Sequence, residues 1–298
     1  MKIEVKELVK SFDGFRALDG VNLSVPAGAV YGLVGPNGAG KSTVLRHLTG
    51  IYRQDSGSVL VDEEPIYENI EKKRRIAYIP DEVFFFPQSS MQDMMKFYAS
   101  QYPTFSRERF EKLGEAFAID PRRPMRKLSR GMQKQAAFQL VLSQCPEIVI
   151  LDEPVDGLDP VMRRQVWNLL LADVAERGTT VVVSSHNLRE LEDVCDHVGI
   201  MDRGRMFLER SLNDLQSGIV KIQIALPEGG KLPEGLHILH SSSVGRVQQL
   251  VLRGNAEEMK EKLSVCKPLV LDVVPLSLEE IFIYEMGGEG HEIKDILL

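Results

Sequence analysis

The sequence predicts an α/β fold followed by a small α+β domain, and three observations support this prediction. Residues 148–151 (IVIL) and 180–183 (TVVV) are short runs dominated by branched apolar residues, the pattern of strands buried on both faces of a parallel sheet. Helical patterns lie between these strands, and helices placed between buried strands indicate a layered α/β architecture. Another apolar run, at residues 30–34, ends in a glycine-rich loop that continues as a helix.

Composition places the chain among ordinary folded proteins. It has 298 residues, 43% of them hydrophobic and 27% charged, which excludes wholesale disorder. A net charge of −7 argues against a protein that holds nucleic acid mainly through a basic surface. Three widely spaced cysteines without a CxxC pair predict neither a disulfide framework nor a zinc site, and they fit a reducing cytosol: Cys145, Cys195 and Cys266.

The chain shows no sign of a membrane span or a signal peptide. No apolar run approaches the roughly 18–20 residues that a spanning helix needs. The residues after Met1 carry charges where a signal peptide would have its apolar segment. We therefore expect a cytoplasmic protein.

Apolar spacing changes twice along the chain. Residues 1–25 alternate as half-buried strands do, and residues 83–142 change to helical spacing, with Ser90 and Ser106 as expected N-caps. After Ser217 the pattern returns to strands, with one helix at residues 255–263 and a capping box that opens a last helix at Ser277. We expect domains at 1–216 and 217–298. The helical stripes are Met91, Met94, Met95 and Tyr98, and Phe110, Leu113, Ala116 and Phe117.

A phosphate-binding motif follows the strand at residues 30–34. Residues 35–42 match G-x-x-x-x-G-K-[ST], whose glycines let backbone N–H groups face phosphate oxygens at a helix N-terminus. Lys41 would reach the β- and γ-phosphates, the Ser42 hydroxyl would hold Mg²⁺, and Thr43 would line the α- or β-phosphate. The predicted nucleotide site comprises Gly35, Pro36, Asn37, Gly38, Ala39, Gly40, Lys41, Ser42 and Thr43.

Two carboxylates, Asp152 and Glu153, follow the apolar run at residues 148–151. Ligands of open α/β sheets bind at the carboxyl ends of the strands, so these side chains should face the phosphate loop. Asp152 is suited to Mg²⁺, usually through a water, and Glu153 to polarising the attacking water as a general base. A strand followed by two acids is common, but downstream of a phosphate loop it predicts hydrolysis.

Residues 128–133, which read LSRGMQ, resemble the LSGGQ signature of the ATP-binding subunits of ABC transporters, with departures at Arg130 and Met132. Ser129 is also an expected N-cap, and an exposed helix N-terminus with Ser and Gly is itself an anion site. The resemblance implies that Ser129 and Gly131 bind the γ-phosphate held by an opposite subunit. Two cassettes would then pack head to tail.

Three further residues match this family, and the resemblance covers about residues 1–215. Asp159 resembles the D-loop residue that crosses the dimer interface. His186, just after the strand at 180–183, matches the switch histidine that contacts the γ-phosphate, although a lone histidine after a strand is more often structural. Phe12 matches the aromatic that stacks on adenine, and a core position is the alternative.

The resemblance implies a P-loop NTPase of the ABC cassette type, with a mixed sheet core, an antiparallel β layer and a helical subdomain at about 83–142. It implies ATP and Mg²⁺ as cofactors, ATP hydrolysis, and a second ATP-binding subunit in a homodimer or heterodimer. It also implies an integral-membrane permease on a separate chain, so the subunit would be peripheral on the inner face of the cell membrane. The C-terminal domain would add dimer contacts or sense a ligand.

One position departs from the family pattern. The family normally has Gln after Tyr-x-Pro, where this chain has Asp81, and Gln88 lies too far from the strand end to replace it. Asp81 can ligate Mg²⁺ directly or through water, but it is shorter than Gln and adds negative charge near the triphosphate. Several exporter-type cassettes carry an acid here, and residues 275–284 resemble the tail of drug- and antibiotic-resistance exporter subunits. The resemblance therefore implies export.

The sequence also contains a run of three phenylalanines and two basic runs, and it leaves one rival function to consider. The run of three phenylalanines at residues 84–86 either forms a hydrophobic surface that binds a cytoplasmic helix of a permease or fills the core of the helical subdomain: Phe84, Phe85 and Phe86. The basic runs at 72–75 and 122–127 are expected to be solvated, with no nucleic acid bound. The rival is a soluble ABC ATPase of translation or DNA maintenance. It is disfavoured because the chain has one cassette and too short an interval before the signature for a coiled coil.

Overall fold

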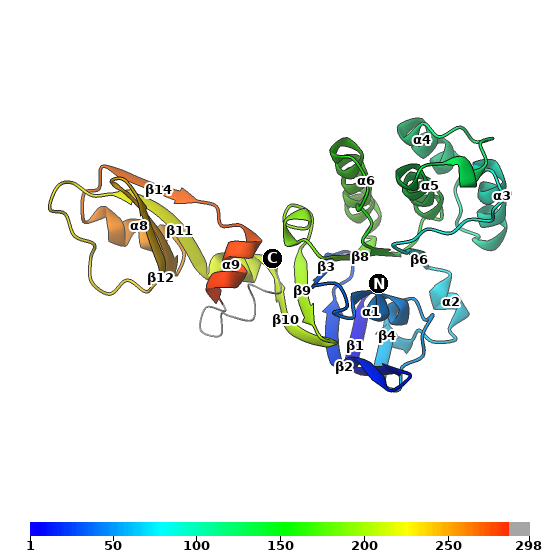
Figure 1. The fold of residues 1–298 in the computed structure, drawn as a ribbon, viewed down its shortest axis with the longest axis horizontal. Helices are drawn as coiled ribbons and strands as arrows, with labels where there is room; N and C mark the ends of the chain where they lie inside the picture. Colours follow the sequence, from blue (N-terminus) through cyan, green and yellow to red (C-terminus); the bar gives the residue numbers. More distant parts are fainter. Residues whose placement is uncertain (286–298) are drawn as a thin grey trace. The chain divides into compact units, whose positions relative to one another are not determined.

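The computed structural model describes residues 1–285, which form two compact units (Figure 1). The first unit comprises Met1–His186 and His197–Glu209. The second comprises Asn187–Asp196 and the chain from Arg210 onward. The expected domain boundary between residues 216 and 217 stays a prediction, and residues 286–298 of the expected C-terminal domain lie outside the described residues.

The first unit begins with a four-stranded sheet in the order β2-β1-β4-β5, whose neighbours pair antiparallel. The predicted alternation holds at the start of β1, where Ile3 and Val5 are buried and Glu4 between them is not, and Leu8 is buried beyond a register shift. Phe12 and Phe15 are register partners at the hairpin tip. This sheet forms the predicted antiparallel layer. Its strands are β1 (Ile3–Phe12), β2 (Phe15–Val25), β4 (Ser56–Val61) and β5 (Glu64–Pro65).

A six-stranded sheet in the order β10-β9-β3-β8-β7-β6 forms the centre of this unit. Strands β6, β7, β8, β3 and β9 pair in parallel. Every residue of β7 and β8 is buried, which confirms the prediction made from their runs, and every residue of β3 is buried as well. The strands are β3 (Val30–Val34), β6 (Ile76–Ile79), β7 (Ile148–Asp152), β8 (Thr180–Ser185), β9 (His197–Asp202) and β10 (Arg205–Ser211).

Helix α1 (Lys41–Leu48) lies between the two sheets (Figure 1). It packs on β7 from one side and on β2 and β4 from the other. Val44, Leu45 and Leu48 are fully buried in a core that draws side chains from both sheets. Burial of each such side chain contributes about 1.5–3 kcal/mol, so the core itself fixes the helix that follows the phosphate loop.

Three helices group together beyond the central sheet (Figure 1). Ser90 accepts a hydrogen bond from the Asp93 N–H, and Ser106 accepts one from the Arg109 N–H, which confirms both predicted caps. Ala116, expected in the second apolar stripe, is exposed because its helical angle places it at the edge of that stripe. The helices are α3 (Met91–Gln101), α4 (Arg107–Phe117) and α5 (Arg130–Ser143).

The basic run at residues 72–75 corrects one expectation. Lys72 is buried and pairs with Glu64 at 3.2 Å, and Lys73 donates to the Gly50 carbonyl at 2.8 Å. These two lysines are therefore structural rather than solvated, because the short helix α2 (Ile70–Lys73) turns Lys72 toward Glu64 of β5 and Lys73 toward the segment that follows α1. The second basic run was predicted correctly, since its basic side chains are exposed: Arg122, Arg123, Arg126 and Lys127.

The long helix α6 (Pro160–Arg177) begins at Asp159, whose carboxylate accepts hydrogen bonds from the Val161 and Met162 N–H groups at 3.0 Å. Near its other end, the buried Asp173 forms an ion pair with Arg109 of α4. Burial raises the pKa of Asp173, and the positive charge of Arg109 opposes that rise. The first unit also has the short 3₁₀ helix η1 (Met125–Lys127), and the short 3₁₀ helix η2 (Leu188–Glu190) belongs to the second unit.

The second unit contains an antiparallel sheet in the order β12-β13-β11-β14, and α8 packs on it. Its core includes Ile222, Ile224, Leu250 and Leu252. Strand β12 was not predicted because nearly all its side chains are exposed and leave no apolar alternation. The elements are β11 (Ile219–Ala225), β12 (Ile238–Val244), β13 (Val247–Arg253), β14 (Val270–Val274), α7 (Leu212–Ser217), α8 (Ala256–Ser264) and α9 (Leu278–Glu285).

Helix α9 begins with the predicted capping box, in which Ser277 and Glu280 each accept a hydrogen bond from the other's N–H. Residues 187–196 pack against the start of this helix, where Arg189 pairs with Glu279 at 2.7 Å. Among the helices of the described chain, none has the length and apolar character needed to span a bilayer.

Candidate active site

The phosphate loop joins the end of β3 to the start of α1, as its motif requires. Gly40 is the N-cap of α1 at φ 105°, and a Cβ there would lie 2.9 Å from Leu18. A Cβ at Gly35 would lie 2.2 Å from the Met201 carbonyl oxygen. Only glycine fits these two positions, because the antiparallel sheet and β9 approach the loop from either side.

A cavity of about 260 Å³ opens beside this loop. It brings the loop together with two acids that lie far away in the sequence, Asp81 and Glu153. Gly35 and Pro36 do not line the cavity, although their carbonyl groups contact Lys41. The lining residues are Phe15, Ala17, Asn37, Gly38, Ala39, Gly40, Lys41, Ser42, Thr43, Asp81 and Glu153.

Lys41 supplies the positive charge of the cavity. Its Nζ donates hydrogen bonds to the carbonyl oxygens of Gly35 at 2.6 Å and Pro36 at 3.3 Å. It also lies 3.3 Å from Glu153 Oε1, and the lysine is 5% exposed. These partners compensate a buried ammonium and hold it where phosphate oxygens would bind.

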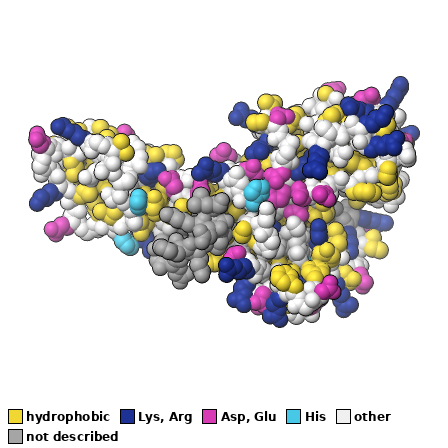
Figure 2. Space-filling model, in the orientation of Figure 1, with side chains coloured by type: hydrophobic (Ala, Val, Ile, Leu, Met, Phe, Trp, Pro, Cys, Tyr) yellow, Lys and Arg dark blue, Asp and Glu magenta, His cyan; other side chains and the backbone are white. Residues whose placement is uncertain are grey.

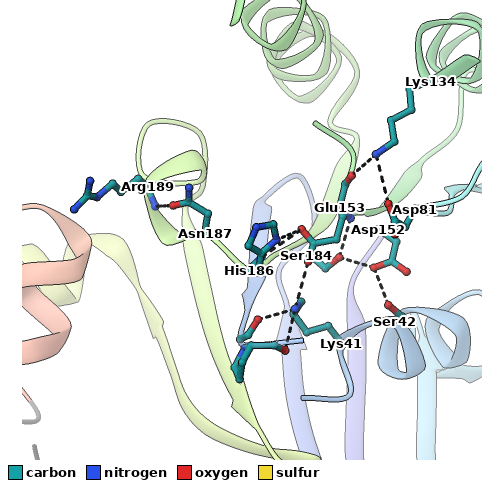
Figure 3. Close-up of polar contacts among 12 residues, drawn as sticks. Lys41, Ser42, Asp81, Lys134, Asp152, Glu153, Ser184, His186, Asn187 and Arg189 are labelled. Carbon is teal, nitrogen blue, oxygen red and sulfur yellow. Dashed lines mark hydrogen bonds and ion pairs between the residues drawn. The ribbon is translucent and has the colours of Figure 1, made fainter. Parts of the chain in front are cut away.

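Asp152 is held by hydroxyl groups from two elements (Figure 3). Ser42 of α1 donates to its Oδ1 at 3.1 Å, and Ser184 of β8 donates to the same atom at 2.6 Å. Tyr78 lies 3.5 Å from Oδ2, and burial together with the negative charge of Asp152 raises the pKa of Tyr78 to about 12. Ser184 was not predicted as a site residue, although a polar residue near the end of an apolar strand was a usable signal.

Glu153 has a left-handed backbone with φ 45°. Such a conformation costs a non-glycine residue about 1–3 kcal/mol and persists only where neighbours enforce it. The Glu153 N–H donates to Ser184 Oγ at 3.1 Å, and its carbonyl accepts from Lys134 Nζ at 2.8 Å. Both sides of the strained residue are therefore anchored, and its carboxylate is turned into the cavity.

His186 lies beside the carboxylate of Glu153, as Figure 3 shows. Its Nδ1 is 3.0 Å from Glu153 Oε2, and its backbone N–H donates to the same oxygen at 3.3 Å. The side chain is 46% exposed, so the ring can also reach a ligand in front of the sheet. Ligand atoms of Glu153, Asp156 and His186 lie within 4.8 Å of one another.

Asp81 borders the cavity, but its nearest charged partner is Lys134, whose Nζ lies 3.6 Å away. The Asp81 side chain is 58% exposed, whereas Lys134 is buried. Lys134 was not predicted as a site residue from the sequence. The sequence did contain a sign that Lys134 is buried, because it lies on the same helical face as the apolar residues Ala137, Phe138 and Val141.

The signature and the D-loop lie against each other, because a Cβ added to Gly131 would be 3.3 Å from the Gly157 carbonyl oxygen. Ser129 caps α5 and accepts from the Met132 N–H at 3.3 Å, which confirms the predicted cap. Within the described part of the chain, the 260 Å³ cavity is not lined by Ser129, Gly131 or Asp159. The structure thus does not bring these three together with the phosphate loop of their own chain.

Two aromatic residues are candidates for contact with a base. Phe12 is 37% exposed and is therefore not a core residue, and its ring packs edge-on against Tyr52 at 5.3 Å. Phe15 is 70% exposed and lines the cavity. Only Phe12 was predicted from the sequence to contact a base, although both aromatics flank the same tight turn. Stacking of Phe12 on adenine stays a prediction.

Of the three consecutive phenylalanines, Phe84 is 78% and Phe86 is 51% exposed, so these two do not form a core. Phe85 is partly buried. Phe86 makes an edge contact at 5.3 Å with Phe97 of α3, which is also exposed. Figure 2 shows hydrophobic surface beside α3, and it shows acidic side chains gathered below α5 and α6. The hydrophobic patch consists of Phe84, Phe86 and Phe97.

A phosphate loop, a buried acid beside its serine and a second acid in the cavity define a nucleotide-hydrolysing P-loop cassette. A family model described as ABC transporter matches residues 18–156. The ABC transporter ATP-binding protein YtrB of Bacillus subtilis (strain 168) is 32% identical over 288 residues, which cover 96% of this chain and 99% of YtrB. The chain belongs to the ABC transporter family of ATP-binding proteins.

Other comparisons agree with this membership. The daunorubicin/doxorubicin resistance ATP-binding protein DrrA of Streptomyces peucetius is 32% identical, over 73% of this chain and 67% of DrrA. The lantibiotic transport ATP-binding protein SrtF of Streptococcus pyogenes is 33% identical, over 70% of this chain and 90% of SrtF. A solved ATP-binding subunit of an ABC transporter superposes with a TM-score of 0.67 at 26% identity, over 72% of this chain and 92% of that one. The chain is therefore an ATP-binding ATPase subunit of a transport system, and its predicted fold is confirmed.

Proposed function

We propose that this subunit pairs head to tail with a second ATP-binding subunit around two ATP molecules and drives export through a separate membrane permease. The main support for this proposal is the position of the signature, residues 128–133. Within residues 1–285, the cavity that contains Lys41 and Glu153 is bordered by neither Ser129 nor Gly131. A second subunit placed head to tail would bring its own signature helix, with a positive N-terminal end, to the γ-phosphate.

In this proposal Glu153 is the general base of hydrolysis. Its two carboxylate oxygens face different partners, Lys41 at 3.3 Å and His186 at 3.0 Å. The carboxylate accepts a proton from the water that attacks the γ-phosphate, while Lys41 and the loop N–H groups orient the phosphates. His186 contacts the γ-phosphate, and loss of that phosphate removes contacts that hold the two subunits together.

The oxygen atoms around Asp152 fit Mg²⁺, which prefers oxygen ligands. Ser42 and Asp152 would hold the ion, with Asp81 at the edge of the same cavity. When bound, the ion supplies positive charge that offsets the charge of the β- and γ-phosphates. Ser184 keeps the Asp152 carboxylate in one orientation through its 2.6 Å hydrogen bond.

The hydrophobic patch of Phe84, Phe86 and Phe97 is the proposed docking site for a cytoplasmic helix of the permease. Docking there would hold the subunit peripherally on the inner, cytoplasmic face of the cell membrane. Export is supported by relatives named for drug resistance and for lantibiotic transport. We assign residues 1–216 to the cassette, with a helical subdomain at about 83–142, and residues 217–298 to an accessory domain.

The dimer is tested with Glu153→Gln, which should bind ATP without hydrolysing it. In ATP and Mg²⁺ this variant should elute as a dimer from size-exclusion chromatography, and in ADP as a monomer. The double variant Lys41→Ala/Glu153→Gln is the matched control and should stay monomeric. Elution of Glu153→Gln as a monomer with ATP still bound would exclude the head-to-tail mechanism.

The permease is tested by affinity purification of the tagged chain from detergent-solubilised cells. A polytopic membrane protein should be recovered with the wild-type chain and lost with Phe84→Ser/Phe86→Ser. Val265→Ser changes an equally exposed apolar residue (79%) and should leave recovery intact. Recovery of ribosomes or DNA instead would support the rival function. A solute-binding protein encoded beside the permease would indicate import rather than export.

A further inference from the structure

The general base is held through its backbone by a residue outside the cavity. Glu153 keeps φ 45°, which is uncommon for a residue with a side chain. Its carbonyl oxygen accepts a hydrogen bond from Lys134 Nζ at 2.8 Å, as Figure 3 shows. Lys134 belongs to α5, so the helix that begins at the signature directly contacts the end of the strand that carries the general base.

The environment of Lys134 indicates that this contact is specific. The residue is 7% exposed, and lysine is almost never buried without partners. Its ammonium group has two partners, the Glu153 carbonyl and the Asp81 carboxylate, which lies 3.6 Å away. A hydrogen bond from a charged donor is about twice as strong as one between neutral groups, so the ammonium can hold the Glu153 carbonyl against backbone strain.

We propose that Lys134 is a positioning residue for ATP hydrolysis. By holding the Glu153 carbonyl, it maintains the left-handed backbone that turns the Glu153 carboxylate toward Lys41 and His186. Among the described residues, Lys134 is not one of those that line the 260 Å³ cavity, so it acts through Glu153 rather than on the nucleotide. The inference rests on the proposed role of Glu153, and it is independent of the permease and of the direction of transport.

Lys134 also pairs with Asp81, the acid by which this chain departs from the family pattern. Asp81 stands where the family has an uncharged Gln and adds a negative charge beside Glu153 at the cavity. The Lys134 ammonium, 3.6 Å from Asp81 Oδ1, offsets part of that charge. Because the Asp81 side chain is 58% exposed, its ion pair is screened by solvent, and the contact with the carbonyl carries the positioning.

Lys134→Met tests the proposal, since it keeps a long side chain and removes the donor. We expect kcat of the purified full chain to fall about tenfold or more, with KM for ATP and nucleotide affinity within about twofold of wild type. Lys134→Arg should restore kcat to within about threefold, because it restores a charged donor. Lys112→Met removes an exposed lysine of α4 that pairs with Glu108 and should retain wild-type kcat.

The outcomes separate this inference from the proposed function. If Glu153→Gln hydrolyses ATP at the wild-type rate, the proposed role of Glu153 fails. If Glu153→Gln is inactive but folded Lys134→Met keeps wild-type kcat, or changes only KM, the positioning role fails. Lys134→Ala replaces Lys134→Met should the latter not fold. If neither folds while Lys134→Arg does, the lysine is structural and the inference is overturned.

Discussion

The Ser42 hydroxyl donates a hydrogen bond to Asp152 Oδ1 across 3.1 Å and thereby joins the first turn of α1 to the end of β7. Ser184 donates to the same oxygen from the neighbouring strand β8. Asp152 is 2% exposed, so these hydroxyls, rather than solvent, set the orientation of its carboxylate. The proposed Mg²⁺ ligands are therefore arranged by three elements that are packed into one core.

This arrangement predicts how hydrolysis depends on Mg²⁺. Ser184→Ala should raise the Mg²⁺ concentration for half-maximal ATPase activity by about tenfold, the usual cost of losing a residue that orients a metal ligand. Asp152→Asn should raise it further. The check is an Mg²⁺ titration of ATPase activity at saturating ATP. An unchanged Mg²⁺ requirement in Ser184→Ala would contradict the orienting role.

The two aromatics of the β1–β2 hairpin predict different effects on ATP affinity. Phe15 lines the cavity, whereas the ring of Phe12 contacts Tyr52. Stacking on a base contributes about 1–3 kcal/mol, so Phe15→Ala should weaken ATP binding by about fivefold or more, and Phe12→Ala by less. Titration with a fluorescent ATP analogue measures both. A larger loss in Phe12→Ala would instead support the assignment made from sequence.

The ion pair between Arg109 and Asp173 predicts a large effect on stability. It links α4 to α6, and Asp173 is 1% exposed. Arg109→Met should lower the free energy of unfolding by about 3 kcal/mol, because it leaves a buried charge unpaired. Arg109→Met/Asp173→Leu should recover most of that loss. Urea unfolding of both is compared with Arg74→Met, which removes an exposed pair and should change stability by about 0.5 kcal/mol or less. Equal losses in the single and double variants would contradict this explanation.

The burial of His47 leads us to expect that the free energy of unfolding falls in acid. The His47 Nδ1 lies 2.7 Å from the Thr43 carbonyl, which can only accept, so Nδ1 carries the proton. Nε2 is buried, and within residues 1–285 it has no hydrogen-bond partner. Burial therefore lowers the pKa of His47, which makes the unfolded chain bind more protons than the folded one below about pH 6.5. The free energy of unfolding should thus fall as the pH drops through and below that value.

His47→Asn provides the matched comparison, because its amide N–H can take the place of Nδ1 without titrating. The stability of the variant should depend less on pH between about pH 7.5 and 5 than that of the wild type. Thermal unfolding measured across this range tests the difference. Parallel pH profiles for the two proteins would show that another group controls acid stability.

Features carried by short stretches of sequence were predictable, because local geometry alone produces them. The phosphate loop, the wholly buried strands and the helix caps at Ser90, Ser106 and Ser129 each depend on neighbours within a few residues. Exceptions arose where exposure hides the pattern, as in β12, or where a charged side chain is buried, as in Lys72. Sequence spacing gives no sign of such burial, since the partners of Lys72 come from another segment.

The amino-acid sequence by itself determined the class of protein, its phosphate loop and its two carboxylates. Strand, loop and helix follow one another directly in the chain, so the spacing of the motif alone places the phosphate-binding groups. Only the tertiary structure decided which side chains support these groups. Ser184 reaches Asp152 from 32 residues away, and Lys134 reaches the Glu153 carbonyl from 19 residues away. Sheet order and helix packing bring those atoms together, and neither can be derived from the spacing of a motif.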